Sequence, residues 1–190
     1  MLPTVPTPRL VLRNLDIEDA YPLQSWASNP EVSQYTLWNP HRHLSDSYQY
    51  IEAVQRRIAD GTDVEWGIEQ DHKLVGTIGL YLLRNCNEKG TGTAELGYAL
   101  AKDAWGQGIA TEAAQHLLQA VQAAMGIGTV YAKTVSANTA SVRVLEKSGF
   151  SLYRIEKTPL AIKGQEYEVS TFKRGRVSIG SRRELLPRRH

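Results

Sequence analysis

The chain has 190 residues and a mass of 21.2 kDa; 42% of the residues are hydrophobic, 22% are charged, and the formal net charge is +2. This size fits one domain with its own core, and the composition excludes a collagen-like, wholly disordered or disulfide-rich protein. The single cysteine, Cys86, excludes an intrachain disulfide and a paired-cysteine zinc site. Without a signal-peptide pattern or a run of about 18 apolar residues, we expect a cytoplasmic protein with no membrane contact.

The first part of the chain predicts one strand and two helices joined by a loop. Leu10 and Leu12 alternate along RLVLR, residues 9–13, as in a strand. Asp16 can cap a helix whose apolar positions recur at three-residue steps, and Ser45 opens a second helix that Gly61 ends. The predicted elements are a strand at 9–13, a helix at 17–28, a loop at 31–44 and a helix at 45–59.

The rest of the chain predicts an antiparallel meander followed by alternating helices and strands. Gly126 and Gly149 are expected to end two helices, and Asn138 is expected to cap the second of them. The predicted elements are strands at 64–70, 73–83 and 93–100, a helix at 108–124, a strand at 129–135, a helix at 138–148 and a closing hairpin of 150–156 and 165–172. This order contains one parallel crossover, at 94–135, so we predict a mixed α/β sheet rather than a doubly wound one.

Basic residues are concentrated at the C-terminus. Residues 173–190 hold seven of the 22 Lys and Arg residues but one acidic residue, Glu184, which leaves 15 basic and 19 acidic residues in 1–172. This mildly acidic remainder argues against a general nucleic-acid binder. We interpret 1–172 as the domain and 173–190 as a basic tail, either a solvated terminus or a weak contact to RNA or the ribosome.

The strongest functional signal is the predicted strand-to-helix junction ELGYALAKDAWGQGIATEA, residues 95–113. Gly106 and Gly108 allow the backbone to approach a ligand, and the unpaired amides of the following helix point toward the same place. No Ser, Asp or Asn caps this helix, which a bound anion would explain. A phosphate site and a plain glycine turn are both consistent with this segment.

Three phosphate-binding motifs can be compared with this junction. A Walker loop requires Gly-Lys followed by Ser or Thr, and the chain has no such run. A dinucleotide fingerprint requires a third glycine and an acidic residue about 20 positions later. Here Thr111 takes the glycine position, and residues 113–145 contain no Asp or Glu. Residues 105–110, WGQGIA, match the acyl-CoA pyrophosphate loop Q/R-x-x-G-x-G/A except at Trp105.

This loop and the segments around it resemble the GNAT superfamily of N-acetyltransferases. The resemblance is greater to the RimJ/RimL branch, in which Trp is common at the first position of the loop, where this sequence has Trp105. Members of this branch acetylate protein N-termini, including those of ribosomal proteins. The similarity spans about 7–172 and includes AELGYAL, NTASVRVLEKSGF, TPRLVLRNLDIEDA and SNPEV. It implies a mostly antiparallel sheet with a central, splayed parallel pair flanked by helices. It also implies acetyl-CoA as co-substrate and no metal.

The resemblance also implies where acetyl-CoA binds. The backbone after Gly97 would pair with the pantetheine arm, the amides of 106–111 would hold the pyrophosphate, and Asn138 would contact the arm as well as cap its helix. The predicted binding residues are Gly97, Tyr98, Leu100, Trp105, Gly106, Gln107, Gly108, Ile109, Ala110, Thr111, Asn138 and Ser141.

Two residues are candidates for catalysis. Glu95 shares a strand face with Gly97 near the sheet centre, and the family often uses this position as the general base, directly or through water. The alternative for Glu95 is an ordinary strand glutamate. Many members of the family use a tyrosine as the acid that protonates the leaving thiolate, but this sequence has Leu145 at that position. Ser141 lies one turn into the same helix, and its hydroxyl is the candidate that replaces the tyrosine. A simple helix-surface serine is the alternative for Ser141.

Other side chains give weaker signals. The histidines show no metal-ligand spacing, and the run from His41 to His43 is expected at the loop surface. Tyr35, Trp38 and Tyr81 are expected either in an acceptor pocket or in the core. The acceptor groove is expected between the two N-terminal helices and the loop that joins them.

These observations together predict an acetyl-CoA-dependent N-acetyltransferase that transfers the acetyl group directly in a ternary complex. A protein N-terminal α-amine, of the ribosomal-protein kind, is the expected acceptor. The first alternative is a small-molecule amine, such as a polyamine, an amino acid or an amino-sugar antibiotic. The second is a non-catalytic acyl-CoA-binding module. A homodimer is considered as well, although the sequence carries no direct signal for it.

Overall fold

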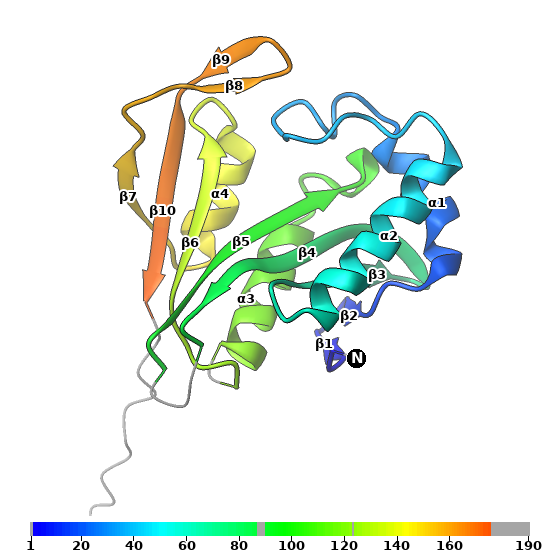
Figure 1. The fold of residues 1–190 in the computed structure, drawn as a ribbon, viewed down its shortest axis with the longest axis horizontal. Helices are drawn as coiled ribbons and strands as arrows, with labels where there is room; N and C mark the ends of the chain where they lie inside the picture. The colour runs from blue at the N-terminus through cyan, green and yellow to red at the C-terminus, as the bar shows by residue number, and fades with distance from the viewer. Residues whose placement is uncertain (1, 87–89, 123, 176–190) are drawn as a thin grey trace, which may run out of the picture.

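The computed structural model describes residues 2–86, 90–122 and 124–175, which form an eight-stranded sheet in the order β1-β2-β3-β4-β5-β6-β10-β7 (Figure 1). The strands are β1 (Val5–Pro6), β2 (Val11–Arg13), β3 (Val64–Gln70), β4 (Lys73–Arg84), β5 (Gly92–Leu100), β6 (Ile127–Val135), β7 (Ser151–Ile155) and β10 (Val169–Gly175). The strands β8 (Leu160–Ile162) and β9 (Gln165–Tyr167) form a separate hairpin.

Helices cover both faces of the sheet (Figure 1). The helices are η1 (Ile17–Asp19), α1 (Ala20–Ala27), α2 (Leu44–Ala59), η2 (Lys102–Ala104), α3 (Ile109–Val121) and α4 (Thr139–Lys147). On one face, α1 packs against β4 and α2 against β3, while on the other α3 packs against β5 and α4 against β6. Within the described residues, no helix is long and apolar enough to cross a membrane.

The core follows the alternation of side chains along the central strands. On β5, Ala94 and Leu96 are buried and join one apolar cluster with Ala113 and Leu117 of α3. The intervening β5 residues, among them Glu95, are only partly buried. Period-two alternation on the strand therefore meets the apolar stripe of the helix, as the sequence pattern predicts.

The central pair β5 and β6 is parallel, whereas the other strand pairs of the sheet are antiparallel. The pairing of β5 with β6 runs only from Gly92 to Glu95 on β5, opposite Ile127 to Tyr131 on β6. Beyond Glu95, β5 remains paired with β4, and β6 remains paired with β10. Figure 1 shows the two strands separating there. The prediction of a mixed α/β sheet with a splayed parallel pair is confirmed.

The structure differs from the predicted elements in a few places. The helix expected at 17–28 begins as the short helix η1, because Asp16 and Asp19 form a capping box around its first turn. The strands β1 and β8 were not predicted. The closing hairpin is confirmed as β7 paired with β10, but its second strand is divided into β9 and β10.

The last strand, β10, includes the first residues of the predicted tail. β10 continues to Gly175, so Lys173 and Arg174 pair with Tyr131 and Val130 of β6 and belong to the sheet. Residues 176–190, which make up the rest of the predicted tail, lie outside the described residues. The proposed contact of that tail with RNA or the ribosome therefore stays a prediction.

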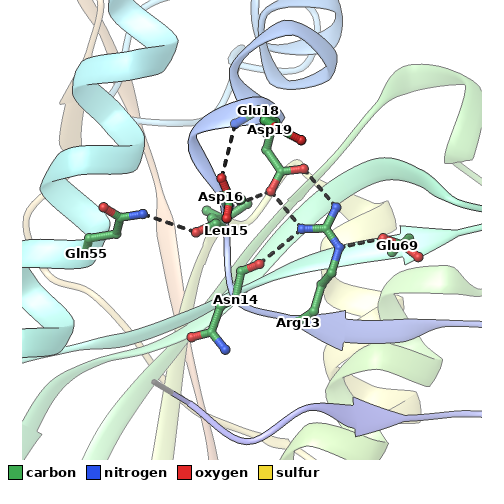
Figure 2. Close-up of polar contacts among 8 residues, drawn as sticks. All are labelled: Arg13, Asn14, Leu15, Asp16, Glu18, Asp19, Gln55 and Glu69. Atoms are coloured by element: carbon green, nitrogen blue, oxygen red, sulfur yellow. Dashed lines mark hydrogen bonds and ion pairs between the residues drawn. The ribbon is translucent and has the colours of Figure 1, made fainter.

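Arg13, at the end of β2, ties the first helix to the sheet (Figure 2). Its Nη1 and Nη2 atoms donate to the two carboxylate oxygens of Asp19 at 2.7 and 2.8 Å, and its Nε donates to Glu69 of β3. The hydrogen bond to Asp19 holds the pKa of Arg13 above its ordinary value. Asp19 also accepts from the backbone N–H of Asp16 at 2.8 Å. This bidentate geometry fixes the start of α1, which forms one wall of the cavity described below.

We predict that Asp19→Ala lowers the free energy of unfolding by about 2 kcal/mol, because it leaves a partly buried guanidinium without its bidentate partner. The measurement is denaturant unfolding of the full chain. The matched control is Glu52→Ala, which removes an exposed pair with Arg56 at 3.9 Å and should cost less than about 0.5 kcal/mol. Equal effects of the two substitutions would contradict this role of Arg13.

Candidate active site

The glycine loop before α3 adopts the backbone conformation that its sequence suggested. Gly106 and Gly108 have φ values of +73° and +79°, which side-chain-bearing residues rarely adopt. Gly108 caps α3 without a side-chain hydrogen bond. The first helical bond runs from the N–H of Glu112 to the carbonyl of Gly108, so the amides of 109–111 have no helical acceptor. An anion such as a pyrophosphate fits this arrangement.

The loop is held in place by hydrogen bonds from both sides. Trp105 donates from Nε1 to the carbonyl of Leu100 at 3.0 Å, and Gln107 donates from Nε2 to the carbonyl of Asp103 at 2.6 Å. Arg9 donates from Nη1 to the carbonyl of Gln107 at 3.1 Å and from Nε to Glu112 at 2.7 Å. Sequence reasoning did not single out Arg9, since it is far away in the chain and belongs to no local motif.

The predicted binding residues of the α3 turn offer their backbone rather than their side chains. The side chains of Ile109 and Ala110 are buried in the core, and that of Thr111 is partly buried. Ile109 and Ala110 can therefore contact an anion only through their N–H groups, and the predicted binding of an anion by this turn stays a prediction.

Two hydroxyl groups meet near the place where β5 and β6 separate. The hydroxyl of Tyr98 on β5 lies 2.9 Å from Oγ of Ser141 on α4, and burial raises the pKa of Tyr98 to about 12. The N–H of Ser141 donates to Oδ1 of Asn138 at 3.2 Å, so Asn138 caps α4 as predicted. Leu145 is 1% exposed and belongs to the core. The structure thus brings Tyr98, Asn138 and Ser141 together at the splay.

Glu95 lies in the paired part of β5, opposite Tyr81 on β4 and Tyr131 on β6. Its Oε2 is 3.3 Å from Nζ of Lys133, and its side chain is 30% exposed. Glu95 does not line the cavity described next, although Gly97, two residues further along the strand, does.

A cavity of about 330 Å³ lies on the α1 and α2 face of the sheet. Its walls come from α1, the loop 31–44 and α2, which are the segments expected to form the acceptor groove, and its floor comes from β3, β4 and β5. Trp38 and Tyr81 line this cavity, whereas Tyr35 packs against the ring of Tyr167. The expectation that His41 lies on the loop surface is wrong, because its ring is half-buried and lines the cavity.

The floor of the cavity contains a buried carboxylate that the sequence did not reveal. Glu65 on β3 is 1% exposed and accepts hydrogen bonds from the hydroxyls of Tyr50 and Tyr81. Its Oε2 also lies 3.4 Å from Nη2 of Arg57. Burial raises the pKa of Glu65, while Tyr50 and Arg57 act in the opposite direction. Burial likewise raises the pKa of both tyrosines, so each hydroxyl is protonated and donates to Glu65.

Two glycines make room for the ring of Tyr81. A Cβ atom at Gly97 would lie 2.9 Å from the ring, and one at Gly79 would lie 2.8 Å from it. The ring thus lies over β4 and β5, and its hydroxyl reaches Glu65. The pairing of β4 with β5 shifts register just after Tyr81, where Leu82 has a φ of +53°. Such a backbone conformation in a non-glycine residue is common beside functional sites.

The remaining chemistry-bearing side chains are isolated. No group of His, Cys, Asp and Glu within the described ranges has the arrangement of a metal site. Cys86 is exposed, and desolvation raises the pKa of its thiol, which disfavours the reactive thiolate.

The comparisons with known proteins agree with this geometry. Residues 9–151 match the family described as acetyltransferase (GNAT) domain. The uncharacterized N-acetyltransferase p20 of Bacillus licheniformis is 29% identical over 171 residues, which cover 89% of this chain and 94% of that protein. The solved structure of an acetyltransferase from Salmonella typhimurium, which modifies the N-terminal serine of a 50S ribosomal subunit protein, has a TM-score of 0.81 at 18% identity, covering 92% and 100% of the two chains.

A second solved structure is also similar to this chain. The microcin C7 self-immunity acetyltransferase MccE, in complex with acetyl-CoA and AMP, has a TM-score of 0.80 at 20% identity, covering 88% of this chain and 93% of that chain. The family match spans well over half of the sequence, so this chain belongs to the GNAT acetyltransferase family. It is an acetyl-CoA-dependent acetyltransferase, as its motifs predicted.

Proposed function

We propose that this protein transfers the acetyl group of acetyl-CoA to the α-amine of a protein N-terminus. The observation that carries the proposal is the position of residues 97–99 of β5. They lie beyond the point where β5 leaves β6, and they also line the cavity between α1, α2 and the sheet. A donor held along β5 and an acceptor held in the cavity would therefore meet at the same short segment.

The residues present fit acetyl-CoA. The backbone beyond Glu95 has no β6 partner and is available to pair with an extended arm. The amides of 106–111 and the guanidinium of Arg9 suit a pyrophosphate. Bound there, acetyl-CoA supplies a thioester that an amine can attack. Gly97, Tyr98, Leu100, Asn138 and Ser141 would line the path of its arm.

In this proposal Glu95 promotes deprotonation of the acceptor amine, and Ser141 assists the leaving thiolate. The ion pair of Glu95 with Lys133 and its place outside the cavity lining favour an action through water rather than by direct contact. The hydrogen bond between Tyr98 and Ser141 supports the second role, because a protonated tyrosine hydroxyl can resupply a proton to the serine.

Two features bear on the choice of acceptor. The Salmonella structure belongs to an enzyme whose described acceptor is a protein N-terminus, which favours the same class here. MccE, by contrast, was solved with AMP, and the small cavity with its buried Glu65 also suits a compact amine. A small-molecule amine therefore remains the second candidate. We keep a cytoplasmic location, a homodimer and the role of the basic tail as predictions of the sequence.

The acceptor class is tested by incubating the full chain with acetyl-CoA and a panel of amines, with thiol release and mass spectrometry as readouts. We expect acetylation of short peptides at a free N-terminus and none of the same peptides with a blocked N-terminus. Turnover only with polyamines, amino acids or amino sugars would favour the second candidate. Binding of acetyl-CoA without turnover on any amine would indicate a non-catalytic module.

The two proposed catalytic roles are tested by single-turnover kinetics. We expect Glu95→Gln to lower the rate of acetyl transfer about 100-fold, since it removes the carboxylate that promotes deprotonation of the amine through water, and Ser141→Ala to lower it about tenfold. Affinity for acetyl-CoA should change little in Glu95→Gln. The control is Glu52→Gln, an exposed substitution on α2 that should leave the rate unchanged. A normal rate in either variant would remove the role assigned to that residue.

A further inference from the structure

A chain of hydrogen bonds behind the cavity wall fixes the orientation of His41. Gln24 of α1 donates from Nε2 to the backbone carbonyl of His41 at 3.1 Å. Its other amide atom, Oε1, accepts from the hydroxyl of Ser47 on α2 at 3.1 Å. The same Ser47 oxygen lies 2.9 Å from Nδ1 of His41. Ser47 is fully buried, so water does not compete for these contacts.

The proton positions follow from this chain. A serine hydroxyl has one proton, and Ser47 gives it to Gln24. Its oxygen can then only accept from His41, so Nδ1 of His41 carries a proton. In the neutral imidazole, Nε2 is therefore unprotonated and presents a lone pair. The opposite orientation of Gln24 would place two carbonyl oxygens against each other and is disfavoured.

The ring of His41 lines the cavity, and its Nδ1 lies on the side of the buried Ser47, so Nε2 is on the opposite side of the ring. The ring packs between Trp38 and Tyr50, with centroid distances of 5.8 and 5.9 Å, and it lines the cavity. In the part of the chain that the structure describes, Nε2 has no hydrogen-bond partner and is not among the fully buried unpartnered atoms. The lone pair is therefore accessible to a molecule in the cavity.

Burial, rather than the charges around the ring, favours the neutral form of His41. Burial lowers the pKa of His41, and the charge of Asp46 on α2 acts weakly in the opposite direction. The carboxylate of Asp46 is already bound by the backbone N–H groups of residues 42 and 43. The other charged groups of the cavity are Glu65 and Arg57, which pair with each other across its floor.

Trp26 lines the same cavity, but its N–H group is not exposed there. The indole N–H of Trp26 on α1 is buried without a hydrogen-bond partner among the described residues, and Trp26 as a whole is 7% exposed. A buried donor without a partner is rare and costly in a native structure. Trp26 therefore contributes its ring, rather than its N–H group, to the lining of the cavity beside His41.

We propose that Nε2 of His41 is the immediate proton acceptor for the amine in this cavity, and that Ser47 and Gln24 are its positioning residues. This inference rests on the proposed function. The amine nitrogen forms the bond to the acetyl carbon, the carbon–sulfur bond breaks with its electron pair on sulfur, and the nitrogen's proton passes to Nε2. The thiolate takes a proton from the hydroxyl of Ser141 or from solvent. Glu95, outside the cavity lining, would act on this proton only through water.

The tautomer is tested first, without reference to activity. Long-range proton–nitrogen NMR of the histidine-labelled full chain should show His41 protonated at Nδ1 and bare at Nε2 near neutral pH. Its pKa should lie below the ordinary value of a histidine, because burial disfavours the charged ring. A proton at Nε2, or a charged ring at neutral pH, would overturn the inference.

Kinetic variants test the role itself. His41→Asn retains a donor toward Ser47 but removes the base, and His41→Gln places a non-basic oxygen near the position of Nε2. We expect each variant to lower kcat about 100-fold and to lose the low-pH limb of the kcat profile, with the KM for acetyl-CoA unchanged. His72→Asn is the matched control and should behave like the unmodified chain. Its left-handed backbone, with a φ of +62°, suits asparagine.

The positioning role of Ser47 is tested with a measurement that a purely structural role would not change. Ser47→Ala frees the imidazole to adopt either tautomer, so we expect the low-pH limb of kcat to shift while the thermal stability stays close to that of Ser47→Thr.

Unchanged kcat and pH profile in the His41 variants, or loss of the limb in Glu95→Gln instead, would contradict the inference while leaving the proposed function standing. No acetyl transfer by the unmodified chain to any amine would reject both.

Discussion

The separation of β5 from β6 is the constraint on which the rest of the structure depends. Parallel strands normally continue to pair, because an unpaired backbone group away from water is costly. Here the pairing ends after Glu95, and each strand goes on with its other neighbour only. The edge opened in this way borders Ser141 of α4 on one side and the cavity on the other. A ligand that pairs with this edge would complete the sheet.

The parts around this opening are held by contacts that come from distant segments. Arg9, near the N-terminus, holds the glycine loop before α3, and Arg13 holds the start of α1 against β3. On the cavity floor, Glu65 is kept in place by two tyrosines and an arginine, which offset the cost of burying its charge. Figure 1 shows that the opening and the helices α1 and α2 lie on adjacent parts of one sheet. These contacts fix the positions of the side chains around the site, and the proposed chemistry requires such fixed distances.

Much of this arrangement could be predicted from the sequence because its signals are local. The strands β3 and β4, the glycine loop and the Asn138 cap each follow from neighbouring residues, and the parallel crossover follows from their order. The cavity floor could not be predicted in the same way. Nothing near Glu65 in the sequence indicates that Tyr50 and Tyr81 bind it, since the three residues come from α2, β3 and β4. His41 was misplaced for the same reason, because its partners Gln24 and Ser47 lie on two separate helices.

The measurement that tests the account most directly is titration calorimetry of the full chain with acetyl-CoA, with NAD and ATP as controls on the same sample. The account predicts saturable binding of one acetyl-CoA per chain and no comparable heat from either control, because the opening beside β5 and the glycine loop fit the pantetheine arm and the pyrophosphate together. A folded protein that binds no acetyl-CoA would contradict the account at its centre. The loop before α3 would then be only a glycine turn, and the opening would need another explanation.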